Sequence, residues 1–323
     1  MRIATFNLEN LGGDEVTEAE LRARLPILRP QLQRLQADIL CLQEVNAEKV
    51  DGVRALDALD HLLADGLYRD FHRAHSVRPE TGRPADRHNL VILSRWPIEA
   101  QAQVRHDLVP PPQWTPVTAS PRSTEAEAQP FERPLLHAVV RLPSGVPLHV
   151  LDVHLRAPLA VPVRGQKMTG GVWQSQAGWA EGFLLAALRR AAQALEARLL
   201  IDRIFAAEPA ALVVAAGDFN CEERQTPIRI VAGEIDDTGN GALADESLVP
   251  LERSIPESQR WSLIHRGRHA MFDHILVSRT LLGHYRDIEV HNETLGDEAL
   301  AERSIEGAPE SYHAPLVAEF ADP

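Results

Sequence analysis

Polar side chains that can hold a cation or move a proton follow several apolar runs in this sequence. Asn7 and Glu9 come after the first run, Glu44 after the second, and Asp218 with Asn220 after a later one. Carboxylate and amide oxygens are hard ligands that suit Mg²⁺, which takes one or two protein carboxylates beside water and phosphate oxygens. The two cysteines stand far apart and the histidines lack zinc spacing. The residue types therefore favour an oxygen-ligated cation.

The apolar runs before these polar groups have the character of strands. Residues 2–8 alternate and are rich in strand formers, whereas residues 38–45 and 211–216 are short apolar runs of the kind found in buried strands. His154 ends a fourth run, residues 146–154, which belongs to a hairpin by its turn chemistry. Because sheet proteins gather catalytic groups at strand ends, we expect these side chains to lie close together.

Helices are expected between the strands. Thr17-Glu18-Ala19-Glu20 reads as a capping box that opens an amphipathic helix towards Gln36. The 3.6-residue apolar spacing after Trp179 predicts a long helix of about 25 to 30 residues. A second helix is expected to carry Val50, Val53, Leu56, Leu59 and Leu63. Further strands are expected at residues 89–94, 135–142, 271–277 and 315–320.

A single domain is expected to span residues 1–323. Residues 104–134 are dense in Pro, Ser, Thr and Glu, a composition that does not form a packed core, so we interpret them as a long surface excursion. Strand character resumes directly after this segment, which favours an insertion over a linker. Residues 233–258 are acidic, contain glycine and lack a clear period, so they are expected to form a second excursion.

Composition indicates a soluble, cytoplasmic globular protein. The first residues enter an apolar segment at once, but Asn7 and Glu9 interrupt it before a signal-peptide core forms, and charged residues interrupt the longest apolar stretch. Membrane insertion is therefore not expected. The net charge is −13, from 46 acidic against 33 basic residues. Such a charge repels polyanions at long range, which disfavours avid nonspecific nucleic-acid binding but leaves local basic patches open.

Seven motifs occur along the chain in the order seen in the endonuclease/exonuclease/phosphatase (DNase I-like) superfamily. They are Asn7-Leu8-Glu9-Asn10-Leu11, Gln43-Glu44, residues 89–94, His154-Leu155, Gly217-Asp218-Phe219-Asn220, Phe272-Asp273-His274-Ile275-Leu276-Val277 and His313-Ala314-Pro315. The sequence resembles this superfamily from residue 2 to residue 320, and its pattern is similar to that of bacterial predicted extracellular nucleases. The resemblance implies an α/β fold, a four-layer α/β/β/α sandwich of two packed mixed sheets flanked by helices.

The resemblance also implies a metal-dependent hydrolase that cleaves a phosphodiester or phosphomonoester with an activated water, and a nuclease is one such enzyme. The cofactor would be Mg²⁺, with Mn²⁺ as an alternative. Glu44 would be the principal metal carboxylate, supported by Asn7 and Glu9. Asp218 would orient or activate the attacking water, and Asn220 would hold that water and a phosphate oxygen.

Two histidines complete the site that the resemblance implies. His154 would donate to a nonbridging phosphate oxygen and stabilise the charge that grows in the transition state. Asp273 would hold His313 in the useful tautomer, and His313 would act as an acid, a base or a phosphate donor.

One position departs from the family pattern. The histidine near the C-terminus usually follows an aspartate, whereas here Tyr312 precedes His313. A neutral phenol is a poor Mg²⁺ ligand. Glu310 lies two residues earlier and is a candidate substitute, so Glu310→Ala is expected to weaken metal binding more than Tyr312→Phe. The departure also motivates an alternative, a degenerate noncatalytic member that binds a phosphorylated ligand or a partner protein.

Several conspicuous residues are interpreted as ordinary structural positions. His88 and His274 are interpreted as polar positions outside the site. Trp173 and Trp179 are interpreted as caps on the core rather than substrate contacts. The arginines of the first helix, Arg22, Arg24, Arg29 and Arg34, are interpreted as a solvated face. The substrate stays open among nucleic acids, nucleotides, lipid head groups and inositol phosphates, because a fold does not choose among them.

Overall fold

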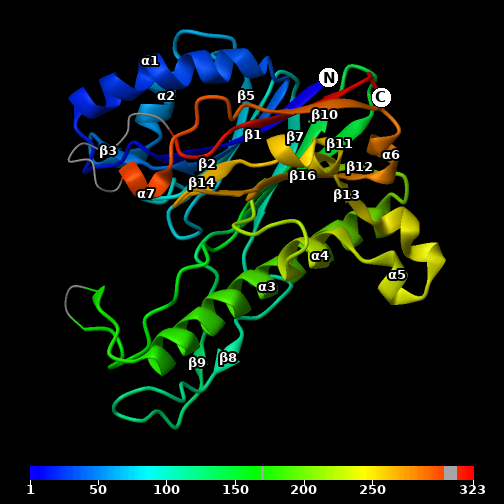
Figure 1. Ribbon diagram of the computed structural model, residues 1–323. Coiled ribbons are helices and arrows are strands. Elements are labelled where there is room, and N and C mark those ends of the chain that lie inside the picture. Colours follow the sequence, from blue (N-terminus) through cyan, green and yellow to red (C-terminus); the bar gives the residue numbers. More distant parts are fainter. Residues whose placement is uncertain (169–170, 302–310) are drawn as a thin grey trace.

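The computed structural model describes residues 1–168, 171–301 and 311–323. Within these residues two six-stranded sheets form the centre of the molecule (Figure 1). The first sheet has the strand order β17 (Tyr285–Val290), β18 (Leu316–Phe320), β1 (Arg2–Leu11), β2 (Ile39–Val45), β6 (Asn89–Ser94) and β5 (His72–His75). The second sheet has the order β13 (Leu248–Pro250), β16 (Asp273–Ser278), β12 (Leu212–Asp218), β11 (Pro147–His154), β10 (Leu135–Arg141) and β7 (Ile98–Val104). Both sheets are mixed, because β1 with β2 and β11 with β12 pair in parallel and the other pairs are antiparallel.

Buried apolar side chains separate the layers of the fold. Ile3 and Ile92 of the first sheet share one cluster with Val150 and Val214 of the second, so the two sheets pack face to face. The outer face of the first sheet packs against α1 (Glu18–Leu35) and α2 (Asp57–Leu63), and the outer face of the second packs against α3 (Gln176–Ala207) and α4 (Thr226–Ala232). The expected four-layer sandwich with two mixed sheets is confirmed.

Local capping explains where the first helix begins. The Thr17 hydroxyl accepts the Glu20 backbone N–H at 3.2 Å, and the Glu20 carboxylate accepts the Thr17 N–H at 2.7 Å. This reciprocal pair satisfies backbone donors that the first helical turn leaves without partners. The helix ends where Gln36 turns into the left-handed region. The capping box predicted from the sequence is therefore present.

The second predicted helix begins later than expected. Val50 and Val53 lie in a hairpin made by β3 (Glu48–Val50) and β4 (Val53–Ala55), and α2 begins only at Asp57. The prediction that these two valines belong to the helix is therefore wrong. Asp51 and Gly52, at φ of 49° and 82°, form the tight turn between the strands. Asp-Gly is a strong signal for such a turn, because both central residues of the favoured type need positive φ.

Residues 104–134 pack more closely than a surface excursion would. They contain the small strand pair β8 (Gln113–Trp114) and β9 (Glu127–Ala128), and Ala119 joins a buried cluster with Val161 and Leu185. The buried Glu181 carboxylate accepts the backbone N–H groups of residues 117 and 118. Part of this segment therefore joins a packed cluster, whereas its interpretation as a surface excursion of a single domain stays a prediction. We call residues 105–133, 156–168 and 171–190 the arm, which extends away from the sheets with the first half of α3 (Figure 1).

The remaining elements are short. Residues 233–258, expected as an excursion, supply the edge strand β13 and several helical turns. The other small elements are β14 (Leu263–His265), β15 (Arg268–Ala270), α5 (Ile235–Thr238), α6 (Arg279–Leu282) and α7 (Glu298–Ala301). In the described ranges no helix combines the length and the apolar character needed to cross a bilayer.

Candidate active site

The ends of four central strands bring polar side chains of both sheets together. The Asn7 side-chain amide donates to Glu44 Oε1 at 3.3 Å within the first sheet. The same nitrogen donates to Asp218 Oδ2 of the second sheet at 3.0 Å. One amide therefore links a carboxylate from each sheet. All three side chains are buried or half-buried, which strengthens their electrostatic interactions relative to water.

The last residues of β12 and the turn that follows them position Asp218 and Asn220. Gly217 has a φ of 146°, and a Cβ at this position would collide with the Val153 carbonyl of the neighbouring strand. Asn220 then donates its backbone N–H to Asp218 Oδ1 at 2.8 Å and its side-chain amide to Oδ2 at 3.0 Å. The same amide donates to the Leu155 carbonyl at 2.9 Å. The Asp218 carboxylate is thus held by three amide donors, including Asn7.

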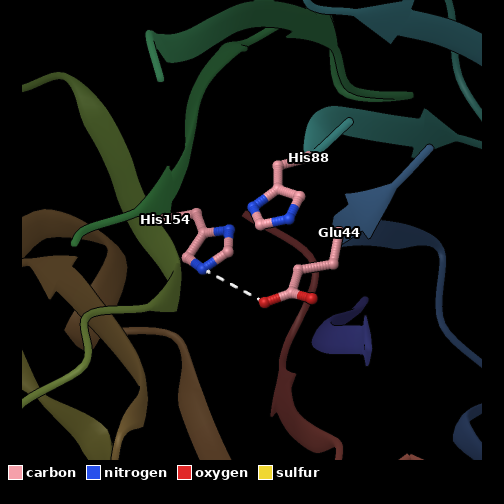
Figure 2. A group of neighbouring side chains, drawn as sticks. All are labelled: Glu44, His88 and His154. Atoms are coloured by element: carbon pink, nitrogen blue, oxygen red, sulfur yellow. Dashed lines mark ion pairs between the residues drawn. The ribbon is translucent and has the colours of Figure 1, made fainter. Parts of the chain in front are cut away.

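His154 faces both carboxylates from the end of β11. Its Nε2 lies 3.6 Å from Glu44 Oε1 and 3.5 Å from Asp218 Oδ2. Figure 2 shows His154 beside Glu44 and His88, with the contact to Glu44 dashed. The His88 and His154 rings stack with centroids 6.0 Å apart and an interplanar angle of 12°. Arg133 donates to His88 Nδ1 from its Nε at 3.1 Å.

The predicted pair of Asp273 and His313 is formed. His313 Nδ1 lies 2.8 Å from Asp273 Oδ2, and His313 Nε2 lies 3.9 Å from Asp218 Oδ2. The Ser311 hydroxyl donates to the Asn7 carbonyl at 2.7 Å, which ties this segment to β1. The imidazole therefore joins the two buried aspartates.

The Glu9 carboxylate contacts Tyr312, the position at which the sequence departs from the family pattern. Its Oε2 accepts the Tyr312 backbone N–H at 2.6 Å, so the Glu9 carboxylate lies beside the residue that replaces the usual aspartate. Glu310, the other candidate substitute, lies outside the described residues. Arg24 donates to the backbone carbonyls of Leu8 and Glu9 at 2.6 and 3.0 Å. The interpretation of Arg24 as part of a solvated face is therefore wrong, because it holds the end of β1.

Five non-glycine residues at the site adopt positive φ. They are Glu9 at 48°, Asn10 at 52°, Glu44 at 58°, His88 at 60° and Asn220 at 51°. Side chains rarely occupy this region, and each such residue costs about 1–2 kcal/mol. Such strain persists only where the surrounding structure holds it, and it clusters at functional sites. Here it turns the chain at the strand ends so that the side chains face one another.

Burial and neighbouring charges shift the ionisation of the acid and base groups. Burial raises the pKa of Asp218 to about 7, against the opposing effect of the His313 cation. Burial disfavours the His313 cation, but the Asp273 and Asp218 carboxylates hold the His313 pKa well above its usual value. Burial and the Arg133 guanidinium hold the pKa of His154 well below its usual value. At neutral pH His313 is therefore a cation and His154 is neutral.

The described residues contain two groups of side chains with metal-binding geometry. One is Glu44 with His88 and His154, and the other is Asp218 with Asp273 and His313, and the ligand atoms within each group lie within 4.8 Å of one another. Between them lies the Asn7 amide, which contacts Glu44 and Asp218. The two groups hold three carboxylates and three imidazoles, and the carboxylates of Glu44, Asp218 and Asp273 supply the oxygen ligands that a hard divalent cation prefers.

The eight residues singled out from the sequence lie in one region of the structure, at the adjoining ends of the two sheets. They are Asn7, Glu9, Glu44, His154, Asp218, Asn220, Asp273 and His313. Sequence reasoning missed two neighbours, His88 and Arg133. His88 directly precedes the strand at residue 89, a position comparable to the ends of the other strands, but Arg133 lies in the segment interpreted as an excursion.

The chain belongs to the Endonuclease/Exonuclease/phosphatase family, whose family model matches residues 4–291. Among curated protein sequences no relative matches. A solved structure of the 3' phosphatase NExo from Neisseria, bound to product DNA hairpin, is 20% identical with a TM-score of 0.54, over 99% of each chain. Truncated Caenorhabditis elegans TDP2 is 16% identical with a TM-score of 0.57, over 99% of this chain and 97% of that one.

A mannosyl-6-phosphatase from Bacteroides thetaiotaomicron has the same fold, with a TM-score of 0.58 and 13% identity over 99% of each chain. At such low identities these structures establish the DNase I-like fold alone. The expected membership of the superfamily is confirmed, whereas the likeness to predicted extracellular nucleases stays a prediction.

Proposed function

We propose that this chain is a phosphoesterase that hydrolyses a phosphodiester or phosphomonoester by attack of an activated water, assisted by Mg²⁺ or Mn²⁺. The observation that carries the proposal is the Asn7 amide, which joins Glu44 of one sheet to Asp218 of the other. The names of the similar structures include a 3' phosphatase and a mannosyl-6-phosphatase, both of which act on phosphate esters.

In this proposal Glu44 holds the cation, with Asn7 and Glu9 beside it. Glu44 Oε1 and Oε2 each accept one amide hydrogen, from Asn7 and from the Asn10 backbone, so further lone pairs stay open for a cation. When bound, a divalent cation supplies positive charge to the phosphate oxygens.

Asp218 acts as the base that takes a proton from the attacking water. A base works best when its pKa lies near the working pH, and burial brings the pKa of Asp218 to about 7. Asn220 keeps the carboxylate in place through two hydrogen bonds. Its side-chain amide donates to Asp218 and to the Leu155 carbonyl, so its Oδ1 is the atom that would hold the water. A cation bound near Asp218 favours its ionised form and lowers the pH at which it becomes a base.

The two histidines stabilise the phosphate as its charge grows. His313 is a cation, oriented through Nδ1 by Asp273, so its Nε2–H is free to donate toward the phosphate. His154 is neutral and places Nε2 toward the space between Glu44 and Asp218. Donors held in place before the reaction stabilise a developing oxyanion without a reorganisation cost.

Turnover of three substrates tests the proposal. Purified protein with Mg²⁺ or Mn²⁺ is assayed on bis-p-nitrophenyl phosphate, p-nitrophenyl phosphate and plasmid DNA. Metal-dependent turnover that Asp218→Ala abolishes supports the enzyme, and the relative rates rank diester, monoester and DNA. The exposed Asp236→Asn serves as the matched control. Absence of turnover on every ester would instead favour the noncatalytic alternative, which the tyrosine at position 312 motivates.

A further inference from the structure

The arm carries a charge opposite to that of the rest of the chain. Its segments, residues 105–133, 156–168 and 171–190, contain eight Lys and Arg against five Asp and Glu, a net charge of +3. The whole chain carries −13, which leaves −16 for the remainder. Charges act over roughly 10 Å at ordinary ionic strength, so close to the arm the electrostatic field attracts polyanions instead of repelling them.

Three arginines with one acidic partner lie where the arm joins the catalytic centre. Arg156 pairs with Glu132, and Arg189 Nη1 lies 3.9 Å from the same carboxylate. The buried Arg190 donates to the Arg156 carbonyl at 3.1 Å. The Nε atoms of Arg156 and Arg190 are buried and have no hydrogen-bond partner among the described residues.

This arginine cluster is short of negative charge. Burial lowers the pKa of Arg156, and the neighbouring Arg189 and Arg190 guanidinium groups lower it further. Burial also lowers the pKa of Arg190, whereas the nearby Asp218 acts to raise it, so the cluster and the catalytic carboxylate interact electrostatically. Arginine forks match the geometry of phosphate oxygens. The cluster therefore lacks an anion, and a phosphate beside the catalytic centre would supply it.

Exposed aromatic rings lie further out on the arm. Trp179 and Phe183 stack with centroids 5.4 Å apart and an interplanar angle of 21°, and their exposed fractions are 42% and 41%. Trp173 and Trp179 both line a surface hollow of about 420 Å³. Lys167 Nζ lies 5.6 Å from the centroid of the Trp173 ring. The interpretation of Trp179 as a cap on the core is therefore wrong.

Two of the rings and one arginine of the cluster lie on one face of α3. At about 100° per residue, Trp179, Phe183 and Arg190 fall within about 40° of one another around the helix axis. Phe183 and Arg190 are separated by about 10 Å along that axis, from a rise of about 1.5 Å per residue. The helix face thus leads from exposed rings to a cation that interacts with Asp218.

We propose that the arm binds single-stranded nucleic acid, with unpaired bases on Trp173, Trp179 and Phe183 and backbone phosphates on the arginine cluster. The inference rests on the proposed function, because the bound strand would offer its phosphodiester to the catalytic centre. Base stacking on aromatic rings combined with a basic track is how proteins bind single strands without sequence preference. A duplex keeps its bases paired and stacked on one another, so no base is left to stack on the aromatic rings of the arm. An apolar protein partner would leave the arginines without an anion.

Oligonucleotide binding, measured without metal so that no turnover occurs, tests whether the arm binds single-stranded nucleic acid. Fluorescence anisotropy follows a labelled oligothymidylate of about 12 nucleotides, within the site sizes of single-strand binders, in EDTA at low salt. Trp179→Ala and, independently, Phe183→Ala are expected to weaken binding at least about fivefold. Trp179→Phe, which keeps a stacking ring, restores most of the affinity. Leu195→Ala, an exposed apolar residue of α3 outside the arm, serves as the matched control.

Salt dependence and strand form sharpen the test. Arg189→Gln is expected to flatten the plot of log affinity against log salt by about one phosphate contact. A duplex of the same sequence should bind more weakly than the single strand. Equal binding of wild type and both aromatic variants would overturn the inference, as would a duplex preference. Concentration-dependent dimers in light scattering that Trp179→Ala abolishes would overturn it too, because a second copy would then cover the rings.

The two proposals fail in different ways. Wild-type protein that binds the oligonucleotide but turns over neither p-nitrophenyl ester nor plasmid DNA contradicts the proposed function and supports the proposed binding of nucleic acid by the arm. Wild-type protein that cleaves bis-p-nitrophenyl phosphate but does not bind the oligonucleotide contradicts only the proposal that the arm binds single-stranded nucleic acid.

Discussion

Replacing Asp218 with asparagine should stabilise the fold while it abolishes the reaction. The carboxyl has an ordinary pKa of 3.8, and burial raises it to about 7 in the folded protein. A raised acid pKa means that the folded state binds the proton more tightly than the unfolded state. The wild-type protein therefore loses stability as the pH rises from about 4 to about 7. Asparagine has no charge to desolvate, so Asp218→Asn escapes this loss.

The size of the stability change follows from the raised pKa of Asp218. At about 1.36 kcal/mol per pKa unit, the ionised carboxylate costs about 4 kcal/mol above pH 7 and about 1–2 kcal/mol at pH 5. The variant also weakens a hydrogen bond, because an amide cannot accept all three donors that hold the carboxylate, at about 1 kcal/mol independent of pH. The difference in unfolding free energy between variant and wild type should therefore be about 2–3 kcal/mol larger at pH 8 than at pH 5.

Urea denaturation in EDTA at pH 5 and pH 8 measures this difference. EDTA is needed because a bound cation would stabilise the carboxylate and mask the cost. Asp236→Asn, on the exposed helix α5, should change stability equally at both pH values. If Asp218→Asn gains the same stability at pH 5 as at pH 8, the raised pKa of Asp218 and its assignment as a base near neutrality are both refuted.

Three further outcomes are expected. Asp273→Asn removes the charge that helps to keep His313 protonated, so the alkaline limb of the pH–rate profile should move to lower pH; an unmoved limb would mean that the reaction does not depend on the His313 cation as a phosphate donor. Arg24→Ala removes the hydrogen bonds to the backbone carbonyls of Leu8 and Glu9, and calorimetry should show an Mn²⁺ affinity about 10- to 100-fold weaker. Unchanged affinity would show that Arg24 does not support the metal site. Glu252→Gln leaves the buried His274 without its ion-pair partner, 2.5 Å away. Urea denaturation should show an unfolding free energy lower by about 3 kcal/mol, and equal stability would show that the pair contributes nothing.

The sheets were predictable because their strands are buried. Residues 38–45, 89–94 and 211–216 are apolar on both sides, as strands covered on both faces must be, and all three form strands. The hairpin at Asp51 and Gly52 was missed because apolar residues at 50, 53 and 56 fit a helical period as well as two short strands. Period alone does not separate these cases, and the Asp-Gly turn signal should have taken precedence.

The site was predictable only where a residue follows a strand. Asp218, Glu44 and His154 each end a recognisable run, so their meeting could be expected from the sheet alone. Arg133 reaches the site from the arm, through a contact between segments distant in sequence, and no local pattern indicates such a contact. The packing of the arm was missed for the same reason, because its core depends on α3 rather than on its own composition.

The pairing of the first and last strands of the first sheet has a consequence for synthesis. β18 lies between β17 and β1, with Arg2 opposite Glu319. Asn7, the amide that joins the two halves of the site, lies on β1. A ribosome-bound chain therefore carries β1 with one edge open until about the last strand has emerged, because contacts so distant in sequence form late. Until then the nascent protein should be inactive and its open strand edge prone to misplaced pairing, which makes this edge a natural target for chaperones.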